Sequence, residues 1–165
     1  MSVSPTETLS SVVCWSLSSQ YDRVRRRVHV LVEPLSTEQL WLRPLPYGNS
    51  VGHLLLHLTG NLSYYIGTQI AGSGYVRDRA REFGDTSHRP KDEVLQDFDR
   101  ALDMVLTALA AQGEADWRAP YRGVGAEDVR DRLTMFVRCA AHADHHTGQM
   151  IYLCKQITLG DLAAR

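Results

Sequence analysis

Three histidines stand within five residues in the stretch AHADHHTGQM, which runs from Ala141 to Met150 near the C-terminal end. In a helix, His142 and His146 would lie one turn apart on the same face, about 6 Å along the axis. Two imidazoles at this spacing can converge on one transition-metal ion. The same spacing also suits two structural histidines in a helical core, so the pair alone is a weak indication of a metal.

A further histidine, His57, lies in the apolar stretch LLLHLTGN of residues 54–61. Leucines on both sides predict that His57 is buried, and a buried imidazole stays neutral and needs a partner. Asn61 and Tyr64 follow at i+4 and i+7 on the same helical face, and His53 precedes at i−4. Three neutral imidazoles from two helices would form a tetrahedral site with one open position. The alternative is that each histidine bonds a carbonyl or a tyrosine in the core, and spacing alone leaves both possibilities open.

Long helices must position these residues, because strand signals are nearly absent and helical periodicity is strong. The expected helices run from Ser4-Pro5 to Val32, from Val51 behind the N-cap Ser50 to about Gly72, from Lys91 to about Gln112 and from Glu127 to Thr158. The segments 36–50, 75–89 and 113–125 are expected to be loops. Together these features predict an all-α fold, an up-down four-helix bundle with long connecting loops, in a single domain over residues 1–165.

The last helix carries two apolar stripes. One contains Val129, Leu133, Phe136, Ala140, Thr147, Ile151 and Cys154, and the other contains Met135, Cys139, His142, His146, Met150 and Leu153. The two histidines therefore lie among apolar neighbours and not on a solvated face. A helix that is apolar on two sides must be covered on both, either by the rest of the bundle or by a second subunit. We expect a homodimer, since soluble oligomers are most often twofold.

Composition and motifs exclude several classes of function. The chain has 18 Lys+Arg and 19 Asp+Glu, a net charge of −1, which argues against nucleic acid or a membrane as partner. It shows no signal peptide and no apolar run of roughly 18 residues. Cys14, Cys139 and Cys154 are widely spaced without a CxxC motif, as in a cytoplasmic protein with reduced thiols. HExxH, Glu-x-x-His, GxSxG, Walker A and GxGxxG motifs are all missing.

The two histidine segments, HLLLHLTGN and HADHHTGQM, resemble the DinB/YfiT-like superfamily of metal-binding four-helix bundles. Within it, the chain is similar to a branch in which an NS-x₅-LHL-x-GN helix is followed by R-D-R-x-x-E-F. The matching residues are Asn49-Ser50, Leu56-His57-Leu58, Gly60-Asn61, Arg77-Asp78-Arg79 and Glu82-Phe83. The resemblance covers about residues 5–158. The motifs are weak singly and moderately specific together.

The resemblance implies a metal site with His57, His142 and His146 as ligands, and zinc or nickel as the divalent transition metal. His53 falls where relatives often carry a residue that is not a ligand. The position of His145 varies in the family, which makes it a candidate for an outer contact to the site or to a substrate.

The Gly-Gln step after the histidines also matches the family pattern. Gly148 is expected to permit close helix packing. Gln149 is expected either to contact the edge of the site or to cap a neighbouring loop, and these alternatives have equal weight.

The R-D-R-x-x-E-F segment allows two interpretations. The favoured one is an ion-paired loop clamp of Arg77, Arg79, Glu82 and Phe83, with Phe83 as its apolar plug. The other is a lid whose arginines bind an anionic substrate.

By resemblance, the function would be metal-dependent thiol transfer or hydrolysis on a small molecule, with a low-molecular-weight thiol as possible partner. Asn61 and Tyr64 would orient ligands or substrate, and His145 would be a proton shuttle. The alternative is a non-catalytic metal-binding dimer with a structural or stress-response role. No carboxylate is expected near the ligands to serve as a general base, which favours that alternative.

Overall fold

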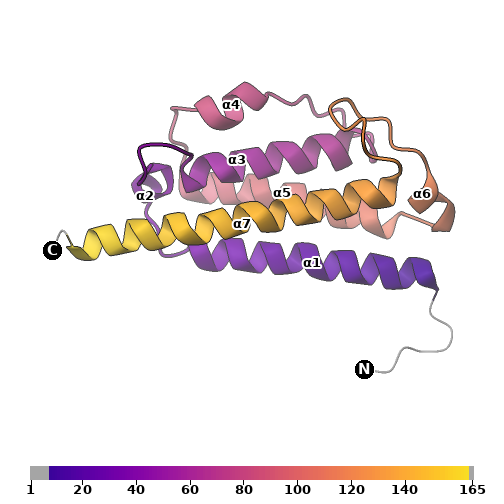
Figure 1. Cartoon of the computed structure of the whole chain (residues 1–165), viewed down its shortest axis with the longest axis horizontal. Coiled ribbons are helices and arrows are strands. Elements are labelled where there is room, and N and C mark those ends of the chain that lie inside the picture. Colours follow the sequence, from indigo (N-terminus) through magenta and orange to yellow (C-terminus); the bar gives the residue numbers. More distant parts are fainter. Residues whose placement is uncertain (1–7, 164–165) are drawn as a thin grey trace.

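Four long helical segments and three short helices make up the part of the chain that the structure, a computed structural model, describes: residues 8–163, with side chains as far as Gly160 (Figure 1). The elements are α1 (Leu9–Val32), α2 (Thr37–Trp41), α3 (Val51–Leu62), the π-helix η1 (Ser63–Thr68), α4 (Arg79–Gly84), α5 (Lys91–Ala110), α6 (Glu114–Arg118) and α7 (Arg132–Ala163). Within residues 8–163 the only strand-like pairing is an isolated bridge between Pro120 and Asp131. The predicted all-α class is confirmed.

The long helices begin at residues whose side chains accept hydrogen bonds from free backbone N–H groups. Thr8 accepts from the N–H of Ser11 at the start of α1, and Ser50 accepts from the N–H of His53 at the start of α3. At α7, the carboxylate of Asp131 accepts from the N–H of Thr134 at 2.8 Å. The predicted start at Ser4-Pro5 lies outside the described residues.

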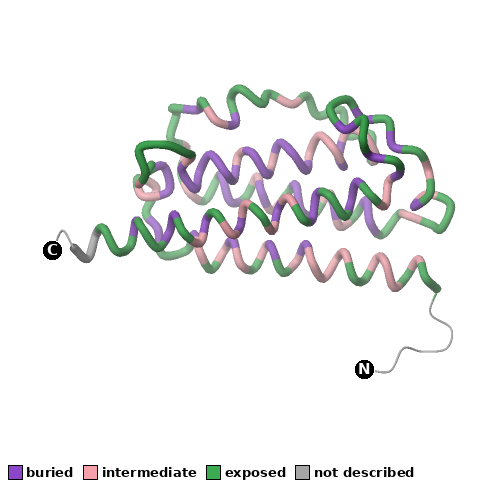
Figure 2. The backbone as a smooth tube through the Cα atoms, viewed as in Figure 1, coloured by how far each residue is buried: buried purple, intermediate pink, exposed green. Residues whose placement is uncertain are grey.

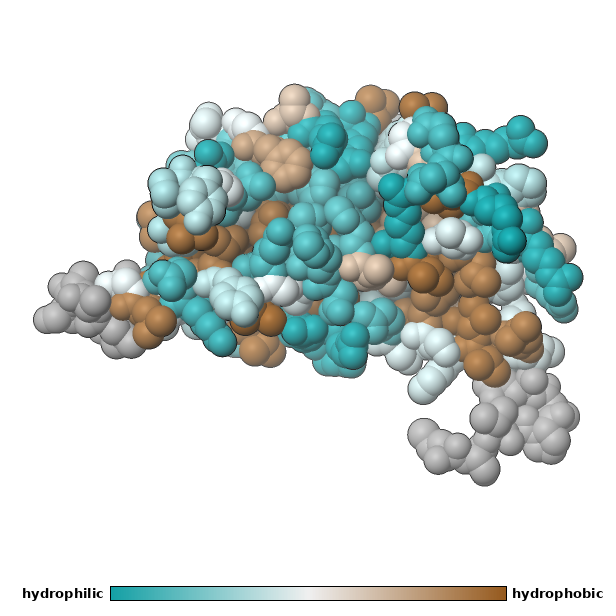
Figure 3. All heavy atoms as spheres, in the orientation of Figure 1, coloured by the Kyte–Doolittle hydropathy of each residue, from teal (hydrophilic) through white to brown (hydrophobic). Residues whose placement is uncertain are grey.

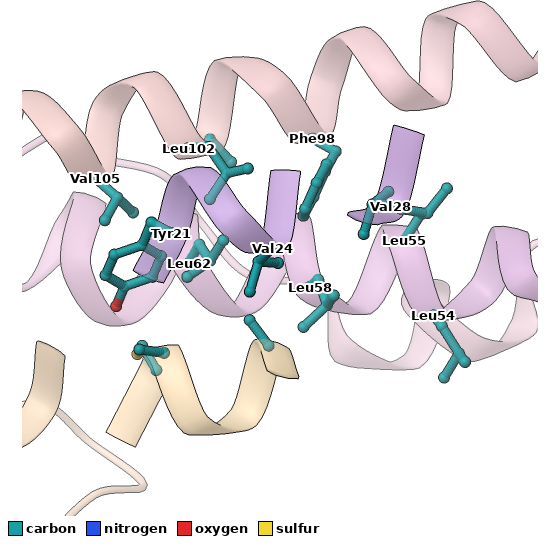
Figure 4. Close-up of a cluster of buried hydrophobic side chains, with 14 of the residues drawn as sticks. Tyr21, Val24, Val28, Leu54, Leu55, Leu58, Leu62, Phe98, Leu102 and Val105 are labelled. Carbon is teal, nitrogen blue, oxygen red and sulfur yellow. The ribbon is translucent and has the colours of Figure 1, made fainter. Parts of the chain in front are cut away.

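One core joins the long helices. α1 packs against α5 and α7, and α3 packs against the same two helices from the other side. Figure 2 shows the buried residues on the facing sides of these helices, and Figure 4 shows side chains of three of them meeting in the middle. The labelled ones are Tyr21, Val24 and Val28 from α1, Leu54, Leu55, Leu58 and Leu62 from α3, and Phe98, Leu102 and Val105 from α5. In α5, apolar residues recur at steps of three and four from Val94 to Leu109, and this stripe is buried.

The three segments predicted as loops each contain a short helix, which corrects that prediction. α2 forms because Ser36 and Gln39 make a reciprocal capping box. α4 forms behind the N-cap Asp78, and α6 begins after Gly113. Helices this short have too few residues to show a hydrophobic period. Their polar composition therefore predicted loops.

Two helix boundaries also differ from the prediction. The last helix begins at Arg132 and not at Glu127, because Asp131 caps it and the bridge between Pro120 and Asp131 holds the preceding segment. The second long helix is α-helical only to Leu62, after which η1 takes over, with a bond of 3.2 Å from the N–H of Gln69 to the carbonyl of Tyr64, five residues back. The wider turn of a π-helix changes which side chains face the core.

Both apolar stripes of α7 are covered inside one chain. Met135, Cys139 and Met150 of the second stripe are buried, as are Phe136 and Cys154 of the first. No second subunit is therefore needed to cover α7. The homodimer stays a prediction, but the apolar stripes of α7 no longer support it.

The face seen in Figure 3 is mostly hydrophilic, with an apolar area at one end. Hydrophilic side chains cover most of the face in Figure 3, and apolar ones gather toward the end where α1 begins, where Leu9 and Trp15 are exposed. Among the described helices none is both long and apolar enough to cross a bilayer. All three cysteines are free thiols, as expected, with Cys139 and Cys154 buried.

Candidate metal centre

His57 from α3 and His142 and His146 from α7 come together between these two helices. Each offers a ring nitrogen, and the three nitrogens all lie within 4.8 Å of one another. The Nε2 atoms of His57 and His142 are 2.9 Å apart. The ring centroids are 4.4 Å apart for His142 and His146, and 4.9 Å apart for His57 and His146. This cluster could hold a metal ion.

Glu82 determines which nitrogen of His57 faces the cluster. Its Oε2 lies 2.8 Å from Nδ1 of His57, and both side chains are buried. Because an ionised carboxylate only accepts hydrogen bonds, Nδ1 must carry the proton and donate it to Glu82. In the neutral ring, Nε2 then carries the lone pair and directs it at the other imidazoles. Metal-binding histidines commonly have this arrangement, in which an outer carboxylate orients the ring.

Arg77 holds Glu82 in place. Its Nε donates to Oε1 of Glu82 at 2.6 Å and its Nη2 donates to Oε2 at 2.9 Å. Burial alone would raise the pKa of Glu82, but the hydrogen bonds from His57 and Arg77 outweigh burial and leave that pKa below its usual value. The guanidinium of Arg77 in turn lies 5.5 Å from the ring centroid of Tyr65. Glu82 is therefore an anion that fixes a ring and not a base waiting for a proton.

Gly60 makes room for this carboxylate. A Cβ added at Gly60 would lie 2.9 Å from Cδ of Glu82, too close for an ordinary contact. Gly60 belongs to the helix that carries His57, so the glycine lets α4 bring Glu82 against α3. The glycine of the Gly-Asn pair in the sequence motif thus has a steric role.

His142 and His146, the two cluster histidines of α7, are held neutral. Burial, followed by the neighbouring imidazoles, lowers the pKa of His142 to about 4. Burial also lowers the pKa of His146, in opposition to its hydrogen bond with Gln149. The Nδ1 of His146 donates to Oε1 of Gln149 at 2.7 Å, which leaves Nε2 of His146 with its lone pair. Of the two roles open to Gln149, the structure shows the contact at the edge of the site.

These observations fit a transition-metal site. The donors are three imidazoles, the tautomers of His57 and His146 are set by outer partners, and the nitrogens are near enough to share one ion. Imidazole ligands suit zinc and nickel. The donor set therefore fits the predicted kind of metal, and the ligand roles of His57, His142 and His146 stay a prediction.

A cavity of about 470 Å³ adjoins the cluster. Its lining includes His57 and His142, and the remaining residues are Asn61, Tyr65, Arg77, Arg79, Gly125, Met135, Arg138 and Cys139. No Asp or Glu is among them. The volume lies in the range of small-molecule sites.

Asn61 lines the cavity as its position in the helix predicted, but Tyr64 does not. Tyr65 takes the place that an unbroken α-helix would have given to Tyr64, because the wider turn of η1 shifts the register by about one residue. His145 is exposed outside the cavity, and it connects to the cluster through Gln149, whose amide lies 3.3 Å from its Nε2. Neither Tyr64 nor His145 lines the cavity, so no contact with the cavity supports the roles suggested for them.

The R-D-R-x-x-E-F segment forms the predicted ion-paired clamp between Arg77 and Glu82, and Phe83 packs on His57 with ring centroids 4.7 Å apart. Arg79 makes no ion pair among the described residues. The expectation that no carboxylate lies near the ligands was wrong, since Glu82 bonds His57. Sequence reasoning missed Glu82 as a partner of His57 because 25 residues separate them, although the motif had already singled out this residue.

Two other expectations concern single residues. His53 is not part of the cluster, as expected, since it bonds Ser50 and the carbonyl of Asp85. Gly148 was expected to permit close packing, but nothing lies within 4 Å of an added Cβ there. That expectation was wrong, because Gly148 sits on a side of α7 that no helix approaches.

Comparison of the sequence and the structure with known proteins agrees with the fold and the histidine cluster. The family model of the DinB superfamily matches residues 20–150, and the chain belongs to that superfamily. A conserved protein from Enterococcus faecalis, known from a crystal structure, is similar in fold, with a TM-score of 0.73 at 14% identity over 93% of this chain and 99% of that one. At this identity the likeness concerns the fold alone. No curated protein matched the sequence.

Proposed function

We propose that this protein is a metal-dependent enzyme that acts on a small molecule, with His57, His142 and His146 as ligands. One observation carries the proposal: three imidazoles converge directly beside a cavity that has room for a substrate. A purely structural metal site would be closed by protein on all sides. Here His57 and His142 themselves form part of the cavity wall.

The chemistry that we favour is transfer of a low-molecular-weight thiol, with hydrolysis second. A divalent zinc or nickel ion with neutral ligands would supply positive charge that makes a thiol or a water molecule more acidic. Because no Asp or Glu lines the cavity, no carboxylate there can assist water as a general base. A thiol has a pKa near 8.5, far below that of water, and needs less assistance.

The chain's own residues would act in three ways. Glu82 and Gln149 keep the ligand nitrogens deprotonated and aimed at the site. Asn61 and Tyr65 orient the small molecule, since both line the cavity. Phe83 covers one face of His57 and limits water on that side.

The test begins with metal content and thermal melting of the wild type and His142→Ala. Zinc at 100 times its Kd should stabilise the wild type by about 2.7 kcal/mol, which raises Tm by roughly 5–10 °C for a chain of this size. His142→Ala should show no such rise and should melt like the wild type in chelator. Equal destabilisation of the variant with and without metal would make His142 a plain core residue.

A second step addresses catalysis. Low-molecular-weight thiols should raise the Tm of the metal-loaded protein and leave that of the chelated protein unchanged. Protein that binds metal but responds to no thiol, and shows no transfer or hydrolytic activity, would instead be a non-catalytic metal-binding module. The absence of a carboxylate from the cavity is the observation that keeps this second candidate in view.

A further inference from the structure

We propose that the cavity beside the histidine cluster binds a small molecule with a carboxylate group, and that Asn61 and Arg79 recognise that group. The carboxylate group would define the substrate class of the proposed enzyme, so this inference rests on the proposed function. Its physical basis, however, is the charge and the unpartnered polar groups of the cavity wall, which exist without any metal.

The wall of the cavity has one uncompensated positive charge. Three arginines line it, but Arg77 is bound to Glu82, and Arg138 is bound to Asp128 at 2.7 Å. Arg79 has no hydrogen bond or ion pair among the described residues. A single free guanidinium suits a singly charged carboxylate, which it can bind through two parallel hydrogen bonds. A doubly charged phosphate would call for more than one free cation.

Asn61 supplies an independent indication of a ligand. The residue is only 7% exposed, and its amide makes no hydrogen bond to another described residue. Its amide atoms are not among the fully buried polar atoms that lack a partner, so they reach the open space of the cavity. Because Asn61 lines the cavity, a bound molecule can provide the missing partner. The amide N–H₂ group would donate to the same acidic group or to a neighbouring carbonyl.

Part of the wall is formed by less polar side chains. The sulfurs of Met135 and Cys139 lie 3.5 Å apart, and the ring of Tyr65 closes the side toward η1. Tyr65 is held there because its hydroxyl donates to the carbonyl of Gly125 at 3.2 Å. The ligand that fits therefore has an acidic end and an uncharged or thiol-bearing body that faces the histidines.

Calorimetric titration of the metal-free protein tests this inference, with propionate, the uncharged propionamide and inorganic phosphate as probes. Propionate should bind at least tenfold more tightly than propionamide or phosphate. Arg79→Gln should weaken propionate binding about tenfold, a change of about 1.4 kcal/mol. Asn61→Asp, which keeps the side-chain shape and adds a negative charge, should abolish it. Arg26→Gln is the matched control, because Arg26 is an exposed arginine on α1 without an ion pair, and it should leave binding unchanged.

Equal binding of propionate and propionamide, or an equal loss in Arg26→Gln, would overturn the proposal. Phosphate binding in preference to propionate would overturn the carboxylate assignment. The titration uses chelated protein, so its result is independent of the metal. Propionate binding by a protein that takes up no zinc would defeat the proposed function alone, and zinc uptake without propionate binding would defeat this inference alone.

Discussion

Two histidines one turn apart on α3 have opposite surroundings. His53 and His57 are both buried, 2% and 4% exposed, and they stand at the two ends of the same run of three leucines. The Nδ1 of His53 accepts a hydrogen bond from the hydroxyl of Ser50 at 2.6 Å, and its Nε2 donates to the carbonyl of Asp85 at 3.0 Å. His57 has one nitrogen bound to Glu82, and its other nitrogen faces His142.

The difference shows what separates a structural histidine from a candidate ligand. Burial and apolar neighbours are the same for both, so neither property distinguishes them. What differs is the second nitrogen: the backbone and a hydroxyl use both nitrogens of His53, whereas His57 keeps a lone pair for the cluster. The edge of the Trp41 ring also covers the His53 ring, at a centroid distance of 5.3 Å, and closes off that side.

The largest expected effect comes from exchanging the two histidines for alanine. His57→Ala removes a ligand and should weaken zinc binding more than 100-fold, beyond the 10–100-fold typical of losing an outer partner. His53→Ala should keep zinc affinity within about threefold, yet lower the free energy of unfolding by about 2–4 kcal/mol, because Ser50 and Asp85 lose their partner. Zinc titration and chemical unfolding of the two variants measure these effects.

If His53→Ala lost zinc as strongly as His57→Ala, the contrast between the two positions would be wrong. Zinc bound equally well by His57→Ala would remove His57 from the ligand set.

A smaller effect is expected at Glu82, the residue that makes His57 different. In Glu82→Gln, the amide cannot accept from both His57 and Arg77, because one end of it is a donor. Zinc affinity should fall 10–100-fold, and stability should fall by about 3–5 kcal/mol, since the buried guanidinium of Arg77 loses its counter-ion. The double variant Arg77→Gln/Glu82→Gln should regain part of the stability but not the affinity, as measured by the same titrations.

Gly60→Ala tests the position of Glu82 by a steric change. The added methyl group should displace Glu82, weaken zinc binding and cost about 1–3 kcal/mol. Gly148→Ala on α7 is the control, since its methyl group meets nothing within 4 Å and should be neutral or slightly stabilising. Zinc affinity unchanged in Gly60→Ala would show that the position of Glu82 is unimportant to the site.

The smallest effect concerns pH in the metal-free protein. Burial lowers the pKa of His142 to about 4 and also lowers that of His146. The unfolded chain, with histidine pKa values near 6.5, binds more protons than the folded chain between about pH 4 and 6.5. Stability should therefore decrease as pH falls through this window and level off below it. His142→Gln should make the decrease shallower in urea unfolding at several pH values, and an unchanged slope would contradict the burial of His142.

Local sequence was sufficient to predict the long helices and the shared face of His142 and His146 on α7. The i, i+4 spacing of His142 and His146 places them together in any helix, and the stripe from Val94 to Leu109 defines one buried face. The short helix α4 was missed, and with it the approach of Glu82 to His57, because a six-residue element has no periodic signal. Tyr65 was missed because nothing in the periodicity marks the change to a π-helix at Ser63.

The sequence by itself therefore determined the all-helical class, the long helices and the residue types that could bind a metal, since these depend on contacts within one or two turns. Only the tertiary structure decided which nitrogen of His57 is free, that Arg77 and Tyr65 support Glu82, and that a cavity without carboxylates adjoins the cluster. Those features depend on where separate elements meet in space. Side chains 25 and 85 residues from His57 meet it there, and helical periodicity carries no information on such distances.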